Sequence, residues 1–247
     1  MAGAERYSDA ERHLRHYLGG PGEARPRLAA CCAMQWLSRT HERPRVALAF
    51  DDFPFTTDSA RALLDVLDRE GVRATLFTIG RKVGSRAELV RRAAAAGHSI
   101  QNHTFSHPRW REPTVEQVRS ECLQCSEVIE RVIGRRPLLL RWPGGRCSEN
   151  VQQQAHRCGL ICIDPIVTEI PDLGADPRRI RRLPRARAGA GQIIVFHDGP
   201  AATRRALPGI IADLHHHGAE LVTAPELLGL EPLAGRGRQD SAAGREK

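Results

Sequence analysis

Two histidines four residues apart are the first sign of chemistry in this chain. His103 and His107 lie downstream of an aspartate pair, Asp51 and Asp52. Two imidazoles and a carboxylate can bind one divalent metal ion, and three protein ligands leave coordination positions open for water and substrate. Such a set is typical of a catalytic site. The pattern therefore predicts a metal-dependent hydrolase.

These residues need a scaffold that brings them together. Short apolar runs typical of buried strands alternate with amphipathic runs typical of helices. The expected strands cover Val46 to Phe50, Ala74 to Ile79, Ser99 to Asn102, Leu138 to Arg141, Leu160 to Ile163 and Ile193 to Phe196. The expected helices lie near Asp58 to Glu70, Arg86 to Ala96, Thr114 to Ile133 and Ser148 to Cys158. This alternation predicts an α/β fold around a parallel sheet, open or closed into a barrel.

Polar residues gather at the ends of the expected strands. The clusters are Asp51 with Asp52, His103 with His107, Arg141, and His197 with Asp198. Parallel sheets and barrels collect catalytic groups at the carboxyl ends of their strands, so we expect these side chains to converge.

Length and composition indicate one catalytic domain. The chain has 247 residues with 41% hydrophobic content, enough for one sizeable core. We expect this domain at residues 44–229, after an N-terminal extension of uncertain structure (1–43) and before a Gly/Arg-rich disordered tail (230–247). No apolar run approaches the roughly 18 residues of a membrane span, and no signal peptide is readable. The expected location is cytoplasmic as written, or the cell envelope or outside the cell if the true start lies upstream.

The charge does not point to nucleic acid. The net charge of +8 comes from arginines scattered along the whole chain, and aromatic residues are only 4% of the sequence. A nucleic-acid binder concentrates its cations and adds aromatics for stacking. The densest run, Arg178 to Arg187, is interpreted as a solvated helix face.

The seven cysteines are an odd number without the spacing of a disulfide framework, which favours buried thiols in a reducing compartment. Cys122 and Cys125 form a single C-x-x-C inside an expected helix. No second pair completes a zinc site, so we expect no structural zinc there.

Four ordered motifs resemble those of the polysaccharide deacetylase family, also described as the NodB-homology domain or carbohydrate esterase family 4. They are Ala49 to Pro54, His103 to His107, Arg141 to Gly144, and Ile194 to Asp198. The resemblance spans roughly residues 43 to 228. It implies a distorted, incomplete (β/α) barrel that removes acetyl groups from an N-acetylated glycan.

The resemblance implies three metal ligands, Asp52, His103 and His107. Zinc is the expected ion, and cobalt, iron or nickel suit the same ligands. It also implies that Asp51 is the base that takes a proton from the attacking water, with Arg141 keeping it ionised.

His197 resembles the general acid that protonates the leaving amine. The resemblance assigns Trp142, Pro143 and Gly144 to substrate and oxyanion binding, with the Gly144 N–H as the oxyanion donor.

Two substitutions depart from the family pattern. Phe53 stands where the family usually has glycine, and its ring is expected to narrow the cleft. Asp51 and Asp52 can share one site only if the chain leaves strand geometry there. Gly144 replaces an aromatic residue, which removes a ring from the groove wall.

The family's aspartate-tryptophan motif is also missing. Asp164, Glu169 and Asp172 lie in its region, and we expect Asp164 or Glu169 to orient His197 in its place. Asp198 is expected to be structural.

The predicted activity is removal of N-acetyl groups from chitin-type or peptidoglycan N-acetylglucosamine through metal-activated water. The alternatives are an O-acetyl esterase, a small-molecule amidase on the same scaffold, and a pseudoenzyme that binds glycan without turnover.

Overall fold

The computed structural model describes residues 44–145, 147–163, 167–187 and 191–230. The expected N-terminal extension, and the expected tail from residue 231 on, lie outside the described residues. The domain boundaries therefore remain predictions.

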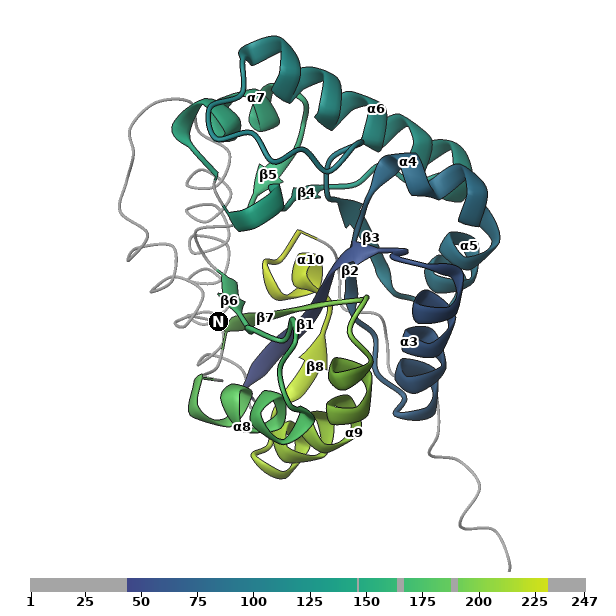
Figure 1. Ribbon diagram of the computed structural model, residues 1–247, viewed down its shortest axis with the longest axis vertical. Helices are drawn as coiled ribbons and strands as arrows, with labels where there is room; N and C mark the ends of the chain where they lie inside the picture. The colour runs from purple at the N-terminus through teal and green to yellow at the C-terminus, as the bar shows by residue number, and fades with distance from the viewer. Residues whose placement is uncertain (1–43, 146, 164–166, 188–190, 231–247) are drawn as a thin grey trace, which may run out of the picture.

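A curled parallel sheet forms the centre of the fold (Figure 1). Its strands are β1 (Arg45–Phe53), β2 (Thr75–Thr78), β3 (Ser99–Asn102), β4 (Leu139–Leu140), β5 (Ile161–Cys162), β6 (Val167–Glu169), β7 (Gln192–His197) and β8 (Glu220–Val222). The hydrogen-bonded order is β5-β4-β3-β2-β1-β7-β6, and β8 pairs with the start of β1. Among the described residues no pairing joins β5 to β6. The predicted incomplete (β/α) barrel is confirmed.

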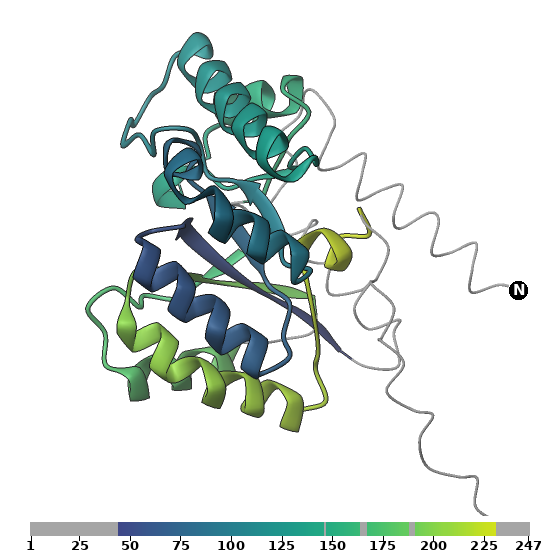
Figure 2. The same cartoon turned by 90° about the vertical axis from the view of Figure 1, so that its right-hand side faces the viewer.

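Helices follow most strands. They are α3 (Thr57–Arg69), α4 (Gly80–Val83), α5 (Ala87–Ala95), α6 (Val115–Ile133), α7 (Glu149–Arg157), α8 (Pro177–Arg187), α9 (Ala201–His216) and α10 (Ala224–Leu227), with 3-10 turns η1 (Gly84–Arg86) and η2 (Pro143–Gly145). Helix α3 packs between α5 and α9 on one side of the sheet (Figure 2). None of the described helices combines the length and apolar character needed to cross a membrane.

Local sequence explains where the two longest predicted helices begin. Thr56 caps α3 in a reciprocal capping box with Ser59, and Thr114 does the same for α6 with Gln117. Several short elements were not predicted, and neither were β6 and α9. Strand β6 has only three residues, and α9 contains Pro208, which disfavours a helix in sequence-based reasoning.

The first part of the arginine run, whose side chains are described, forms an exposed helix face, as predicted. Arg178, Arg179, Arg181 and Arg182 of α8 are exposed, whereas Ile180 is buried against the core.

The cysteines differ from expectation in one respect. Cys122, Cys125 and Cys158 are buried free thiols, but Cys147 and Cys162 form a disulfide. The sequence analysis missed this bond because the two residues flank α7 without any spacing that marks a disulfide framework.

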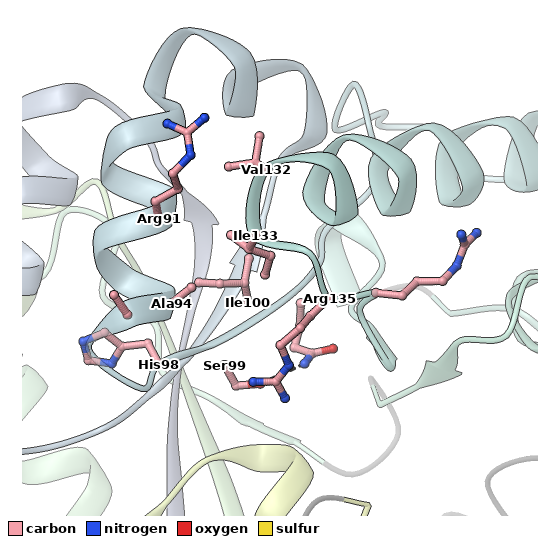
Figure 3. Close-up of a pocket in the computed structure, with 11 residues that line it drawn as sticks. Arg91, Ala94, His98, Ser99, Ile100, Val132, Ile133 and Arg135 are labelled. Carbon is pink, nitrogen blue, oxygen red and sulfur yellow. Dashed lines mark hydrogen bonds between the residues drawn. The ribbon is translucent and has the colours of Figure 1, made fainter.

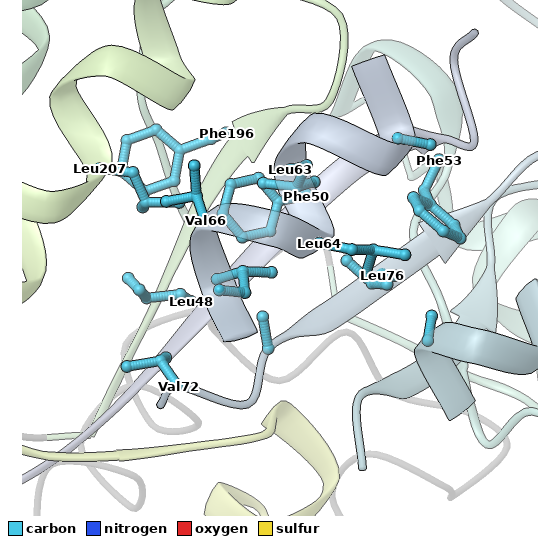
Figure 4. Close-up of a cluster of buried hydrophobic side chains, with 14 of the residues drawn as sticks. Leu48, Phe50, Phe53, Leu63, Leu64, Val66, Val72, Leu76, Phe196 and Leu207 are labelled. Carbon is cyan, nitrogen blue, oxygen red and sulfur yellow. The ribbon is translucent and has the colours of Figure 1, made fainter. Parts of the chain in front are cut away.

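Strand β1 has apolar side chains on both faces, as expected of a central parallel strand. Leu48 and Phe50 pack with Leu63 and Leu64 of α3 in the main core cluster (Figure 4), and Ala47 lies in a second cluster on the other face.

Phe53 belongs to the same main cluster, with a relative exposure of 0%. The expectation that its ring narrows the cleft was wrong. The end of β1 is irregular, and a large apolar ring is more stable in the core than in water.

We expect Phe53→Ala to destabilise the protein by about 3 to 5 kcal/mol, because it removes a fully buried ring and leaves a cavity. Denaturant unfolding monitored by circular dichroism measures this change. Phe53→Leu, which keeps most of the apolar volume, serves as the control. If the free energy of unfolding of the alanine variant falls by less than about 1 kcal/mol, the packing role of Phe53 is contradicted.

Candidate active site

The end of β1 presents two neighbouring carboxylates to one site. Asp52 has a left-handed backbone, with φ 66°, and the pairing of β1 with β2 shifts register between Phe50 and Phe53. In a regular strand, successive side chains point to opposite faces. The turn at Asp52 removes that alternation, so the expectation that the chain leaves strand geometry here is confirmed.

Asp52, at the end of β1, converges with His103 and His107 of the loop that follows β3. Asp52 Oδ1 lies 3.1 Å from His107 Nε2 and 3.6 Å from His103 Nε2. One potential ligand atom from each residue lies within 4.8 Å of the others. These three atoms are a suitable set of protein ligands for one divalent ion.

The loop that carries both histidines is held in place by buried polar groups. Thr104 and His107 have positive φ values of 65° and 60°, so the segment is no helix. Glu121 of α6 accepts hydrogen bonds from the backbone N–H and the hydroxyl of Ser106, at 2.7 and 2.6 Å. Sequence reasoning missed Glu121; a carboxylate on the buried face of an amphipathic helix was the available signal.

Protonation states in the site suit a metal. His103 Nδ1 lies 2.8 Å from the carbonyl oxygen of Arg141, which fixes the proton on Nδ1 and leaves the Nε2 lone pair toward Asp52. Burial lowers the pKa of His103, which favours the neutral ring. Burial alone would raise the pKa of Asp52, but the hydrogen bond to His107 and the charges of the nearby histidines bring it to about 2. A neutral imidazole and an ionised carboxylate are what metal binding requires.

Arg141 and Asp51 form a buried ion pair. Arg141 Nε donates to Asp51 Oδ2 at 2.7 Å, and the two side chains are only 2% and 4% exposed. The other carboxylate oxygen, Asp51 Oδ1, is buried and has no hydrogen-bond partner among the described residues. Because buried carboxylate oxygens are almost always hydrogen-bonded, this oxygen is a ready acceptor for a proton or a bound water.

His197, at the end of β7, is oriented by Asp172. Its Nδ1 lies 2.8 Å from Asp172 Oδ1, and its backbone N–H donates to Asp172 Oδ2 at 2.9 Å. Thr203 donates a further hydrogen bond to Oδ2 at 2.6 Å. Burial lowers the pKa of His197, but the hydrogen bond to Asp172 and the charges of Asp51, Asp172 and Asp52 outweigh it and raise the pKa above its ordinary value.

This contact corrects the expectation that Asp164 or Glu169 orients His197. Asp164 lies outside the described residues, and Glu169 Oε2 instead accepts a hydrogen bond from Arg141 at 2.8 Å. Asp172 can take the orienting role because β6 pairs with β7, so the residues that follow β6 lie beside the end of β7, and there the carboxylate is fully buried.

We expect Asp172→Asn to lower kcat/KM by about 10- to 100-fold and to move the basic limb of its pH profile to lower pH. Asn cannot stabilise the imidazolium form of His197, so the pKa of His197 falls and the protonated fraction is lost earlier as pH rises. Acetate-release assays across the pH range measure both effects. Glu169→Gln is the comparison, and an unshifted basic limb in Asp172→Asn would contradict the orienting role.

The turn after Arg141 is only partly open to a substrate. Trp142 is 1% exposed and packs with Val118, Leu140 and Val151, and Pro143 is also buried. Both side chains therefore offer little surface to a substrate, and their assignment to substrate binding stays a prediction. Gly144 is exposed with φ 75°, and its N–H stays the predicted oxyanion donor.

Asp198 has a structural contact, as expected. It is fully buried, and its Oδ2 accepts the backbone N–H of Phe55 at 2.7 Å. Burial raises the pKa of Asp198 to about 6. The contact ties the loop after β1 to the end of β7.

A separate cavity of about 360 Å³ lies at the start of β3, between α5 and the end of α6 (Figure 3). Arg91, Arg135 and Arg136 line it, and Arg136 is paired with Glu130 at 2.8 Å. The cavity is at the opposite end of β3 from His103 and takes no part in the site above.

Comparison with known proteins yields one family. The family model described as "Polysaccharide deacetylase" matches residues 38–163. A peptidoglycan-N-acetylglucosamine deacetylase of Bacillus cereus is 29% identical over 194 residues, which cover 77% of this chain and 70% of that protein. A chitooligosaccharide deacetylase of Bradyrhizobium sp. is 33% identical over 203 residues, covering 74% of this chain and 90% of that protein.

A solved structure agrees with the fold. The peptidoglycan deacetylase PdaC of Bacillus subtilis superposes with a TM-score of 0.69 at 26% identity, covering 76% of this chain and 92% of that chain. Some relatives are longer. The match to the peptidoglycan-N-acetylglucosamine deacetylase PgdA of Listeria monocytogenes covers only 39% of that protein.

Proposed function

The chain belongs to the polysaccharide deacetylase family, and from that premise we propose that it hydrolyses N-acetyl groups on a glycan. The proposed substrates are the N-acetylglucosamine residues of a chitin-type or peptidoglycan polymer. One observation carries the proposal: Asp52, His103 and His107 converge next to the Arg141–Asp51 pair.

We propose that Asp52, His103 and His107 hold a divalent ion, zinc first among the candidates. When bound, such an ion supplies Lewis-acid chemistry that activates water and polarises the acetyl carbonyl. The neutral His103 ring and the ionised Asp52 support this assignment.

Asp51 then acts as the general base. Its unpartnered Oδ1 takes a proton from the water that attacks the carbonyl carbon, while Arg141 on Oδ2 keeps the carboxylate ionised before the step. A new C–O bond forms as the carbonyl oxygen gains negative charge, and the Gly144 N–H donates a hydrogen bond to that oxygen.

His197 acts as the general acid. Asp172 holds the proton of Nδ1, so Nε2 is the nitrogen that faces the reaction and protonates the leaving amine as the C–N bond breaks. The products are acetate and the free amino sugar. The raised pKa of His197 supports this role, since it keeps the acid form available at higher pH.

Acetate release from N-acetylglucosamine oligomers and from peptidoglycan tests the proposal. We expect release that a chelator abolishes and that added zinc or cobalt restores. Release only from O-acetylated sugars would indicate an esterase, and release only from small amides an amidase. Glycan binding without release of acetate from any substrate would indicate a pseudoenzyme and overturn the proposal.

A further inference from the structure

Helix α4 places a lysine beside the proposed metal site. The backbone N–H of Ile79 donates to Phe53 O at 2.8 Å, and those of Gly80 and Arg81 donate to Thr104 O and Phe105 O at 3.0 and 2.9 Å. The helix is thus attached both to the end of β1 and to the histidine loop. A side chain of α4 that faces Asp52 is therefore held at the edge of the proposed metal site.

Lys82 is that side chain. It is half-buried, and its Nζ lies 4.5 Å from the centre of the Phe55 ring. Within the described part of the chain, its ammonium makes no ion pair with a carboxylate. Burial lowers the pKa of Lys82 more than the charge of Asp52 raises it, so its positive charge is incompletely compensated.

Phe55 is partly exposed beside Lys82. The residue is 44% exposed, and its backbone N–H donates to Asp198. Its ring lies against Gly199, where an added Cβ would sit 3.1 Å from ring atom Cδ1. Glycine at 199 therefore permits the close approach of the ring. The part of the ring that stays exposed beside Lys82 and Gly199 can pack against the apolar C–H groups of a sugar ring.

Exposed cations also occur just after the histidine loop. Trp110 is an exposed aromatic residue in the segment directly after His107, between the exposed Arg109 and Arg111. The segments that follow Asp52 and His107 in the sequence thus carry exposed rings together with cations. A neutral glycan uses the rings alone, whereas an anionic glycan uses both.

We propose that Lys82 and Phe55 form a subsite for a carboxylate-bearing sugar next to the acetamido sugar that is hydrolysed. The inference rests on the proposed function and deepens it. Phe55 packs against the ring, and the Lys82 ammonium pairs with the carboxylate. A single negative charge fits better than a dianionic phosphate, because Asp52 and Asp198 both lie within electrostatic range of Lys82.

Two sources of such a carboxylate exist, the lactyl group of a muramic acid residue and the carboxyl group of a uronic acid. Four substrates separate them: glycan strands that alternate N-acetylglucosamine with N-acetylmuramic acid, the same strands with amidated carboxylates, oligosaccharides that alternate N-acetylglucosamine with glucuronic acid, and neutral N-acetylglucosamine oligomers. Acetate release gives kcat/KM for each, and calorimetry gives the affinity.

For the wild-type protein, we expect amidation of the preferred acidic strand to lower kcat/KM by about tenfold, the effect of losing one charge-assisted hydrogen bond. Lys82→Gln should lower kcat/KM about tenfold on that strand. On the amidated and neutral substrates its kcat/KM should stay within about twofold of the wild-type value. Arg81→Gln removes an exposed cation from the same helix and is the matched control. It should change all four values by less than about twofold.

Equal losses for Lys82→Gln on all substrates, or no preference of the wild type for a carboxylate, would overturn the subsite. If the wild type releases no acetate from any substrate, the proposed function fails. The calorimetric affinities then still decide the subsite, because Lys82→Gln must weaken binding of the acidic strand only.

Discussion

Replacement of Asp51 by Asn is expected to lower kcat/KM for acetate release by about three to four orders of magnitude, with metal content unchanged. The Asn amide cannot take a proton, yet it matches the carboxylate in size and its oxygen can still accept the hydrogen bond from Arg141. The proposed metal ligands are untouched. Acetate-release kinetics beside elemental analysis of the bound metal measure the two quantities.

The matched control is Asp65→Asn, which neutralises an exposed carboxylate of α3 paired with Arg92. It should leave kcat/KM within about twofold of the wild type, since exposed ion pairs contribute little. Should Asp51→Asn keep more than about a tenth of the wild-type activity, the general base must be another group.

Removal of one proposed metal ligand is expected to have a comparable effect. His107→Ala should weaken zinc binding by more than about 100-fold and lower kcat/KM by about three orders of magnitude. His107 is partly exposed, and its Nε2 lies 3.1 Å from Asp52 Oδ1, so the change removes one of three converging ligands without a large cavity. Metal titration and acetate release at stoichiometric zinc provide the readouts.

His216→Ala is the control for this variant, since it removes an exposed histidine near the end of α9. It should bind zinc and release acetate like the wild type. If His107→Ala still binds one zinc ion tightly after chelation and refilling, the ligand set proposed here is wrong. Thermal unfolding of both variants separates loss of metal from loss of fold.

Much of the scaffold could be read from the chain because its signals are local. A parallel strand buried on both faces is a short apolar run, and an amphipathic helix repeats its apolar residues at helical spacing, so the limits of β7 and α6 were predicted closely. The sequence also identified the candidate ligands. Their residue types and spacing carry the chemistry, and their position after strands places them at one edge of a parallel sheet.

Other features depended on contacts between residues far apart in the chain. We expected Asp164 or Glu169 to orient His197, and the structure shows Asp172 in contact with it. The local sequence does not indicate which of these carboxylates meets His197. Trp142 and Phe53 were expected at the cleft. The local sequence around an aromatic residue in a site motif does not show whether its ring faces water or the core. Packing decides between the two, since the ring takes the place where most apolar area is buried.

The chemical state of the site is likewise a property of the folded chain. The Arg141 carbonyl sets the tautomer of His103, and the left-handed turn at Asp52 directs two adjacent carboxylates into one site. Residue types and strand ends therefore identified which groups are available. Only the tertiary structure decided which groups are hydrogen-bonded, ionised or exposed, because those properties arise from neighbours that the fold brings together over long stretches of sequence.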